Sequence, residues 1–157
     1  MNNWYEVKIK YQKLNDQGVE KPVSEVYLFD AISFTEAESR INLEIGQMVS
    51  GDFFIMNIKR SNLTEIFPDE TGDRWFKCKV SLITIDESSG KEKKSNMYAL
   101  VQANDVREAY DNLQNQMRGT QSDYEVPAVS ESPILEVFPY FDGDSNQQDE
   151  ASELEAV

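Results

Sequence analysis

Two short stretches of the sequence combine an aromatic ring with two lysines on one side of an expected strand. The residues are Trp4, Lys8 and Lys10 in "NWYEVKIK" and Trp75, Lys77 and Lys79 in "RWFKCKV". Bases stack on aromatic rings, at about 1–3 kcal/mol per base, and cations follow the phosphates of a single strand. Tyr27 and Tyr98 are expected on the adjacent strands, so these side chains together form a candidate nucleic-acid-binding site. The alternative is that the tryptophans pack at strand starts while the lysines keep a sheet edge soluble.

The residues that most catalytic sites need are missing or isolated. Histidine, the most common general base and metal ligand, is absent from the chain. The densest carboxylate cluster, Asp69, Glu70 and Asp73 in "PDETGDRW", has the ligand type for magnesium, but the proline, threonine and glycine around it favour a solvated turn. The single cysteine, Cys78, has no nearby base and is predicted to be a small buried residue. We therefore predict a protein that is not an enzyme and holds no metal and no cofactor.

The composition is that of one globular unit in a reducing compartment. The 157 residues are 39% hydrophobic, which is enough for one core of ordinary size. No stretch approaches the roughly 18 apolar residues of a membrane span, and the start, "MNNWYEVKIKYQK", lacks the apolar run of a signal peptide. A single cysteine cannot form an internal disulfide. We expect a cytoplasmic protein with no membrane partner.

An internal repeat covers nearly the whole chain at an offset of 71 to 72 residues. The phrase "TEIFP" at 64–68 matches "LEVFP" at 135–139, and "NWYEVKI" matches "RWFKCKV". Tyr27 matches Tyr98, and after a one-residue slip Ala31 matches Ala103. An ordered series of matches at one offset indicates a tandem duplication. The repeats are residues 1–68 and 69–139.

Each repeat predicts the order strand, strand, helix, strand. Alternating apolar residues in "NWYEVKIKYQKL" and "RWFKCKVSLITI" indicate half-buried strands, and turns containing glycine join each to a second strand, "VSEVYLFDA" or "SNMYALVQA". The capping-box pairs Ser33–Glu36 and Asp105–Glu108 place both helix starts. Apolar stripes at helical spacing follow: Phe34, Ala37, Ile41 and Ile45, then Val106, Ala109, Leu113 and Met117. "DFFIMNIKR" and "DYEVPAVSE" are the expected third strands, the latter weakened by Pro127.

We predict an α+β fold in which the duplicated unit forms one antiparallel sheet of six strands with two helices on one face. Residues 1–139 make a single globular domain of two pseudo-symmetric repeats, because about 70 residues have little core of their own. Two helices cover only one face of such a sheet, which leaves the opposite face for water or a ligand. The alternation along the first strand places Trp4, Lys8 and Lys10 on that open face.

Acidic residues concentrate toward the C-terminus. The net charge of −14 divides into −3 for residues 1–68, −5 for residues 69–139 and −6 for residues 140–157. The last segment has no basic residue and is predicted to be a disordered tail. Such a tail competes with nucleic acid for a basic face, binds replication or recombination proteins, or only keeps the protein soluble.

Six phrases carry a resemblance: "MNNWYEVKIKYQK", "SFTEAESRI", "IKRSNLTEIFP", "GDRWFKCKV", "LVQANDVREA" and "PILEVFPY". They resemble an uncharacterised family, a domain of unknown function of about 150 residues found in Bacteroidota and their phages. The resemblance covers residues 1 to about 140 and implies a phage or Bacteroidota cytoplasmic setting with no established active site. More loosely, the layout is similar to that of bacterial and phage single-stranded DNA-binding proteins. The chain ends in "EAV", however, without the terminal Pro-Phe with which such tails dock replication partners.

The sequence therefore predicts a single-stranded DNA-binding protein, non-catalytic and tolerant of sequence, that works in phage or mobile-element DNA replication or recombination. RNA is an alternative ligand, because aromatic stacking is indifferent to the sugar. A function of another class is also open, namely an acidic protein–protein interaction module that imitates nucleic acid as an inhibitor or adaptor. The sequence leaves open whether the chain forms a homo-oligomer.

Overall fold

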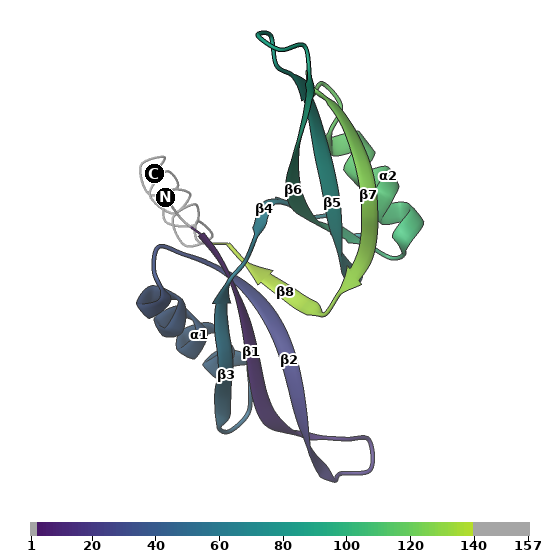
Figure 1. Cartoon of the computed structure of the whole chain (residues 1–157). Helices are drawn as coiled ribbons and strands as arrows, with labels where there is room; N and C mark the ends of the chain where they lie inside the picture. Colours follow the sequence, from purple (N-terminus) through teal and green to yellow (C-terminus); the bar gives the residue numbers. More distant parts are fainter. Residues whose placement is uncertain (1–2, 140–157) are drawn as a thin grey trace, which may run out of the picture. The chain divides into compact units, whose positions relative to one another are not determined.

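The computed structural model describes residues 3–139, within which there are eight strands and two helices (Figure 1). The first repeat contains β1 (Asn3–Leu14), β2 (Glu20–Ala31), α1 (Phe34–Met48), β3 (Phe53–Arg60) and β4 (Leu63–Phe67). The second contains β5 (Arg74–Ile85), β6 (Glu92–Ala103), α2 (Val106–Gln116), β7 (Asp123–Ser132) and β8 (Ile134–Phe138). The α+β class and the repeated order of strand, strand, helix and strand are confirmed. Each repeat adds one short strand, over "TEIF" or "LEVF".

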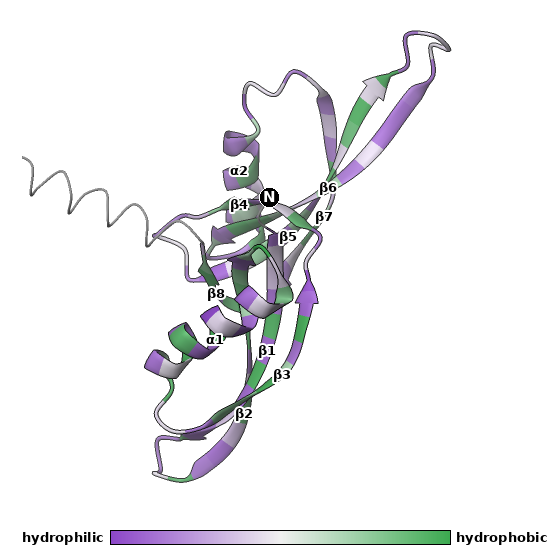
Figure 2. Cartoon of the chain, turned by 90° about the vertical axis from the view of Figure 1, so that its left-hand side faces the viewer, coloured by the Kyte–Doolittle hydropathy of each residue, from purple (hydrophilic) through white to green (hydrophobic). Residues whose placement is uncertain are grey.

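Alternation of apolar and polar residues sets which side of each hairpin is buried. Val7 and Ile9 of β1 are fully buried and pack with residues of β2 against α1. In Figure 2, hydrophobic (green) and hydrophilic (purple) stretches both occur along the strands beside α1. In the second repeat, Cys78 and Val80 of β5 pack in the same way against Leu113 of α2. The core of each half is therefore the layer between one helix and one face of its sheet.

Both helices begin at the predicted caps. The Glu36 N–H donates to Ser33 Oγ over 3.1 Å, and the Glu108 N–H donates to Asp105 Oδ1 over 2.8 Å. These side chains satisfy backbone donors that the first turn of a helix leaves without a partner. The predicted apolar stripes are fully buried at Ala37, Ile41 and Ile45 in α1 and at Ala109 and Leu113 in α2.

The strands form two four-stranded sheets rather than the single antiparallel sheet that we predicted. Their orders are β3-β1-β2-β8 and β4-β6-β5-β7. In each sheet a long antiparallel hairpin is central, and the third strand of the repeat pairs antiparallel along one side of it. The other side of the hairpin would be an unpaired edge, and the added short strand occupies it. Pro127 lies on edge strand β7 at a register shift, a place where a missing N–H is tolerated.

The short strands are exchanged between the repeats. Strand β4 ends the first repeat but pairs in parallel with β6 of the second, and β8 ends the second repeat but pairs with β2 of the first. Figure 1 shows both strands beside these partners. Within the described residues, the chain accordingly divides into a first unit, residues 3–61 with 136–139, and a second unit, residues 62–135. Nearly the same phrase occurs twice in the sequence because each copy supplies the edge strand for the other repeat.

Helix α1 holds the end of β8 in the first unit. The Phe138 ring stacks on Phe29 of β2 with a centroid separation of 4.5 Å and an interplanar angle of 12°. Arg40 of α1 donates to the carbonyl oxygens of Phe138 and Pro139 over 3.3 and 3.2 Å. Its guanidinium also lies 5.6 Å from the Phe29 ring centroid. One cation therefore contacts the Phe29 ring and also holds the backbone of Phe138 and Pro139.

The second unit holds the end of β4 with equivalent residues. Asn112 of α2 corresponds to Arg40 at an offset of 72. Its amide donates to the Gln102 carbonyl and to Asp69 Oδ2, both over 3.2 Å. Phe67 of β4 packs against the core of this unit. The phrase ending in Phe-Pro is thus a docking segment in both places.

Within residues 3–139, neither helix has the length and hydropathy needed to cross a membrane. The predicted disordered tail, residues 140–157, lies outside the described residues. The repeat boundary at residues 68 and 69 also differs from the boundary between the compact units at residues 61 and 62, because β4 is exchanged.

Candidate nucleic-acid interface

The face of the first sheet that points away from α1 carries lysines and exposed apolar side chains. Lys8 and Lys10 of β1 are exposed, and Lys10 lies directly opposite Phe54 of β3. Phe54 is 70% exposed and Met56 is 52% exposed. Trp4, partly buried, lies about 20 Å from Lys10 at the usual rise of about 3.3 Å per strand residue. We call Trp4, Lys8, Lys10, Phe54 and Met56 the lysine face.

Side chains from β3 extend across this face. The Ser24 hydroxyl of β2 lies 3.9 Å from the Met56 sulfur, within hydrogen-bonding range. Because β1 lies between β2 and β3, the Met56 side chain must pass over β1 to reach Ser24. Lys59 Nζ lies 3.8 Å from Glu6 Oε1, so the carboxylate that β1 contributes to this face has a cation beside it. The face is therefore apolar and cationic where Lys8 and Lys10 project.

The corresponding surface of the second sheet has a different chemistry. At an offset of 71, Glu125 takes the place of Phe54 and Ser81 takes the place of Lys10. Glu125 Oε2 lies 3.5 Å from Lys94 Nζ, and Ser81, 6% exposed, donates to Asn96 Oδ1 over 2.9 Å. An ion pair and a buried hydroxyl thus replace the exposed ring and the free cation, and the described part of the second unit does not repeat the lysine face.

The predicted site residues of the second repeat are less accessible than those of the first. Trp75 is 7% exposed, and Lys77 and Lys79 are partly buried. Lys77 donates to Asn62 Oδ1 over 2.9 Å, and its ammonium lies 4.8 Å from the Tyr98 ring centroid. Trp75 therefore presents little ring surface for stacking, and Lys77 already has two partners.

The face away from the helices is not open to water throughout, contrary to our expectation. Leu28, opposite Glu6, and Leu100, opposite Lys77, project from it and are fully buried. In both β2 and β6, three consecutive residues are buried, so side chains on both faces of these strands are covered. A strand that is buried on both faces has a nearly continuous apolar sequence, as these two strands have. The exposed part lies along β1 and edge strand β3.

Tyr27 and Tyr98 lie on opposite faces of their sheets, which corrects their predicted pairing. The β1–β2 loop spans residues 15–19, whereas the β5–β6 loop spans residues 86–91 and is one residue longer. The slip between the repeats therefore falls in the hairpin turn, and Tyr27 corresponds to Ala99. A shift of one residue reverses the face of a strand residue. Tyr27 consequently faces α1 at 4% exposure and does not adjoin the lysine face, whereas Tyr98 lies beside Lys77.

Tyr27 belongs instead to a hydrogen-bonded cluster on the helix side of the sheet. The hydroxyls of Tyr11 and Tyr27 both donate to the Glu25 carboxylate, the latter over 3.1 Å. The hydrogen bond to Glu25, together with burial, raises the pKa of Tyr11 to about 12. Burial, with the nearby Glu25 charge, raises the pKa of Tyr27 well above its usual value. Both phenols are therefore protonated donors at neutral pH.

This cluster predicts a loss of stability at alkaline pH. A tyrosine with a raised pKa binds its proton more tightly in the folded state, so its stabilising effect is complete below about pH 10 and declines as the pH rises toward 12. In urea unfolding between pH 8 and 11.5, we expect Tyr11→Phe to reduce the decline seen in the wild-type chain. The control Tyr110→Phe, at an exposed position on α2, should keep the wild-type pH dependence. Identical pH profiles for Tyr11→Phe and wild type would contradict the linkage.

The carboxylate cluster and the cysteine have structural roles. Asp69 Oδ1 accepts from the Thr71 hydroxyl over 2.7 Å and from the Thr71 N–H over 3.1 Å, and these bonds lower the pKa of Asp69. The predicted turn is confirmed. Among the residues that the structure describes, no group of three or more Cys, Asp or Glu is placed to hold a metal ion. Cys78 is fully buried, as predicted, and burial raises its pKa to about 11, so its thiol is protonated.

Sequence reasoning missed Phe54 and Met56. The signal was present, because Phe54 alternates with Phe53 and Ile55 in "DFFIMNIKR", and one of two adjacent phenylalanines in a strand must face away from the core. Their neighbours on β1 were not predictable, since the register of β3 on β1 shifts between Lys8 and Ile9. That shift places two consecutive residues of β3, Met56 and Asn57, on the exposed side.

Comparison with known proteins identifies a family but no function. The model of a family described as Domain of unknown function (DUF4494) matches residues 3–140. No curated protein and no solved structure is significantly similar to the chain. The matched segment includes every described strand and both helices. The chain therefore belongs to the DUF4494 family.

Proposed function

We propose that the chain binds single-stranded DNA through the lysine face of its first sheet, without catalysing a reaction. The observation that carries the proposal is the pairing of Phe54, 70% exposed, with Lys10 directly across from it on β1. Phe54 and Met56 expose apolar surface together on this face, and contiguous apolar surface is typical of interaction sites. Beside two lysines, the Phe54 ring has the chemistry of a platform for a stacked base.

The arrangement of charge supports a single strand as ligand. Lys8 and Lys10 are exposed and lie two residues apart on one face of β1, so both ammonium groups point to the same side. The two ammonium groups can contact consecutive phosphates of a single strand. A base of the same strand can then stack on Phe54, which lies on the neighbouring edge strand β3. The strong negative charge of the rest of the chain restricts binding to this face. RNA has the same phosphates and bases and remains an alternative ligand.

The family resemblance supports a proposal for the setting of this activity. We place the protein in the cytoplasm, in DNA replication or recombination of a phage or mobile element, where single strands are exposed. Residues 140–157 carry six acidic and no basic residues and would bind replication or recombination proteins, or limit access to the lysine face. An acidic interaction module that imitates nucleic acid is the competing function, and it predicts no binding of DNA by this chain.

Replacing Phe54 with alanine tests the stacking platform. We expect Phe54→Ala to weaken binding of a labelled mixed-sequence 20-mer by about 5- to 150-fold, the equivalent of about 1–3 kcal/mol, in fluorescence anisotropy. Leu43→Ala is the matched control, because Leu43 is 61% exposed in the same unit but lies on α1. Equal affinity of Phe54→Ala and wild type would remove Phe54 from the site.

The phosphate contacts have a separate signature in salt. In the same assay, the double variant Lys8→Gln and Lys10→Gln should lower the slope of log affinity against log salt by about 1.4, at about 0.7 per lost contact. The control is the double variant Lys13→Gln and Lys21→Gln, which removes the same amount of charge from the same hairpin. Lys13 and Lys21 lie opposite each other on the other face of the sheet, so this variant should change the salt slope less. If both double variants change the slope equally, the binding is not local to the lysine face. If the wild-type chain binds no oligonucleotide at low salt, the proposal fails and the interaction module is favoured.

A further inference from the structure

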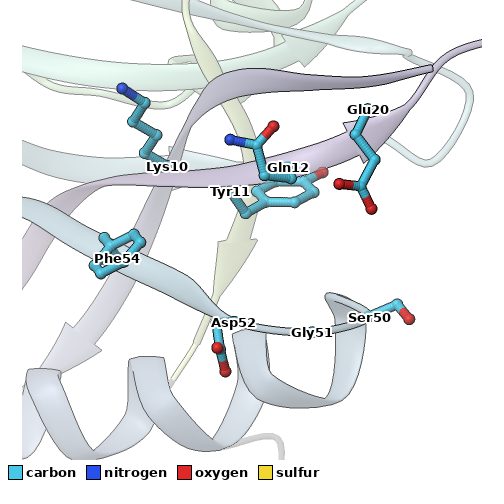
Figure 3. Close-up of a pocket in the computed structure, with 8 residues that line it drawn as sticks. All are labelled: Lys10, Tyr11, Gln12, Glu20, Ser50, Gly51, Asp52 and Phe54. Atoms are coloured by element: carbon cyan, nitrogen blue, oxygen red, sulfur yellow. The ribbon is translucent and has the colours of Figure 1, made fainter.

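The lysine face ends in a hollow where β1 and β3 separate. The register between these strands runs as far as Tyr11 opposite Phe53, while β1 continues to Leu14. The space beyond the last pair has a volume of about 350 Å³, within the range of small-ligand sites. Figure 3 shows the residues that line it: Lys10, Tyr11, Gln12, Glu20, Ser50, Gly51, Asp52 and Phe54.

Four of the lining side chains belong to the same face of the sheet. Lys10 and Gln12 alternate along β1, and Phe54 lies directly opposite Lys10. Glu20 lies opposite Leu14, which is on that same side of β1. Directly opposite residues in an antiparallel pair project to one face. The hollow is therefore continuous with the lysine face.

The lining residues divide into a stacking part and a hydrogen-bonding part. Phe54 is at one end of the hollow, and Gln12 and Glu20 are toward the other end, next to the segment Ser50–Asp52 (Figure 3). In this view the Glu20 carboxylate is directed toward that segment, whereas the Asp52 side chain extends to its other side. Phe54 and Glu20 are two strands apart and about 13 Å apart along β1, at the usual rise of about 3.3 Å per residue, so one base cannot contact both. The nucleotide next to the one stacked on Phe54 would have its base edge toward Gln12 and Glu20, with Lys10 beside the phosphate that joins the two nucleotides.

The chemistry of Glu20 distinguishes among bases. An ionised carboxylate only accepts hydrogen bonds, whereas the Gln12 amide both donates and accepts. Cytosine presents an amino donor at the position where thymine presents a carbonyl acceptor, next to a methyl group. A carboxylate pairs with the first and is repelled by the second. The two pyrimidines are otherwise close in size, so stacking on Phe54 does not discriminate between them.

We propose that this hollow selects bases that carry an exocyclic amino group, and cytosine over thymine in particular, with Glu20 as the discriminating residue. This inference rests on the proposed function, because it names the base that the single-strand site prefers. The first unit would then recognise the identity of a base as well as contact the phosphate backbone of the DNA. Selection at one position is compatible with broad tolerance of sequence elsewhere along the strand.

Two homopolymers of equal length test the selectivity. In fluorescence anisotropy at fixed salt, the wild-type chain should bind labelled oligodeoxycytidine about 10-fold more tightly than oligodeoxythymidine. Glu20→Gln should bring the two affinities within about twofold, because glutamine can also donate to the thymine carbonyl. The readout is the ratio of the two affinities, in which any general effect of removing one negative charge cancels.

Glu38→Gln is the matched control, since Glu38 is an exposed carboxylate on α1 in the same unit and lies outside the hollow. It should leave the ratio unchanged. Equal wild-type affinities, or a Glu20→Gln ratio equal to that of wild type, would overturn the selectivity while leaving Phe54-dependent binding, and thus the proposed function, in place. Absence of binding to both homopolymers would overturn both.

Discussion

Replacing Phe138 with alanine is expected to destabilise the first unit by about 2–3 kcal/mol, although Phe138 belongs to the second repeat of the sequence. Truncation of a fully buried phenylalanine costs about 3–5 kcal/mol, and Phe138 is partly buried. The variant loses the stack on Phe29 at 4.5 Å and the contact with Tyr27 at 5.9 Å. It also loosens the chain end that Arg40 holds.

The reciprocal variant is Phe67→Ala. Phe67 ends β4, belongs to the first repeat and packs in the core of the second unit. We expect it to destabilise the second unit by a similar amount. Leu135→Ala, at a position of β8 that is 54% exposed, is the control and should change stability by no more than about 0.5 kcal/mol.

Native-state hydrogen exchange separates the two effects, because it reports the stability of each region. Phe138→Ala should lower the protection of the buried β1 amides, such as those of Val7 and Ile9, and spare those of Cys78 and Val80 in β5. Phe67→Ala should do the opposite. If each variant instead lowered protection in its own repeat, the exchange of strands would be wrong. Equal losses in both units would show that the units unfold together.

Gly72→Ala is expected to destabilise the second unit by about 2–3 kcal/mol, near the upper end of the usual cost of overpacking. A Cβ on Gly72 would lie 2.6 Å from Ala103 N and 2.7 Å from Ala103 Cα. These are backbone atoms at the end of β6, so no side chain can move aside. The turn is also fixed, because Gln102 Nε2 donates to the Gly72 carbonyl over 3.1 Å and the Gly72 N–H donates to the Asp69 carbonyl over 2.9 Å.

Gly46→Ala provides the matched substitution with the opposite sign. Gly46 lies inside α1, and a Cβ there would meet no heavy atom within 4 Å. Alanine favours the helix by about 0.8–1 kcal/mol over glycine. In thermal unfolding, Gly46→Ala should raise the midpoint and Gly72→Ala should lower it. A Gly72→Ala midpoint at or above the wild-type value would mean that the turn opens without cost and that Gly72 is not needed for its close approach to β6.

Local structure was largely predictable from the sequence. The caps at Ser33 and Asp105, the alternating strands and the buried stripes of both helices each depend on residues within about ten positions of one another. The repeat doubled this information, since the same pattern at an offset of 71 to 72 residues confirmed each element. Along β1, the same alternation correctly placed Trp4, Lys8 and Lys10 away from the helix.

The candidate site was predictable only in part. Tyr27 was assigned to the wrong face of the sheet because the hairpin loop of the second repeat is one residue longer than that of the first. Residues after this loop therefore align at an offset of 72 rather than 71, and the sequence matches alone did not show where the offset changes. Phe54 was missed because its exposure depends on the register of β3 on β1. The burial of Trp75 likewise depends on neighbours that the alternation of β5 does not specify.

The sequence by itself determined the elements, their order and the side of each strand that is apolar, because these follow from backbone geometry and local side-chain patterns. Only the tertiary structure decided where the two short strands dock. The segments "TEIF" and "LEVF" have the same local pattern whichever hairpin they join, and their choice of partner depends on contacts between residues about 35 to 110 positions apart, such as Phe67 with Val101 and Phe138 with Phe29. Backbone hydrogen bonds at a sheet edge can be made by any strand of suitable length, so they do not distinguish one hairpin from the other. The choice of hairpin depends instead on how the last phenylalanine of each short strand packs and on the helix residue beside it. The same packing leaves β3 as an exposed edge strand in the first unit, and with it the lysine face.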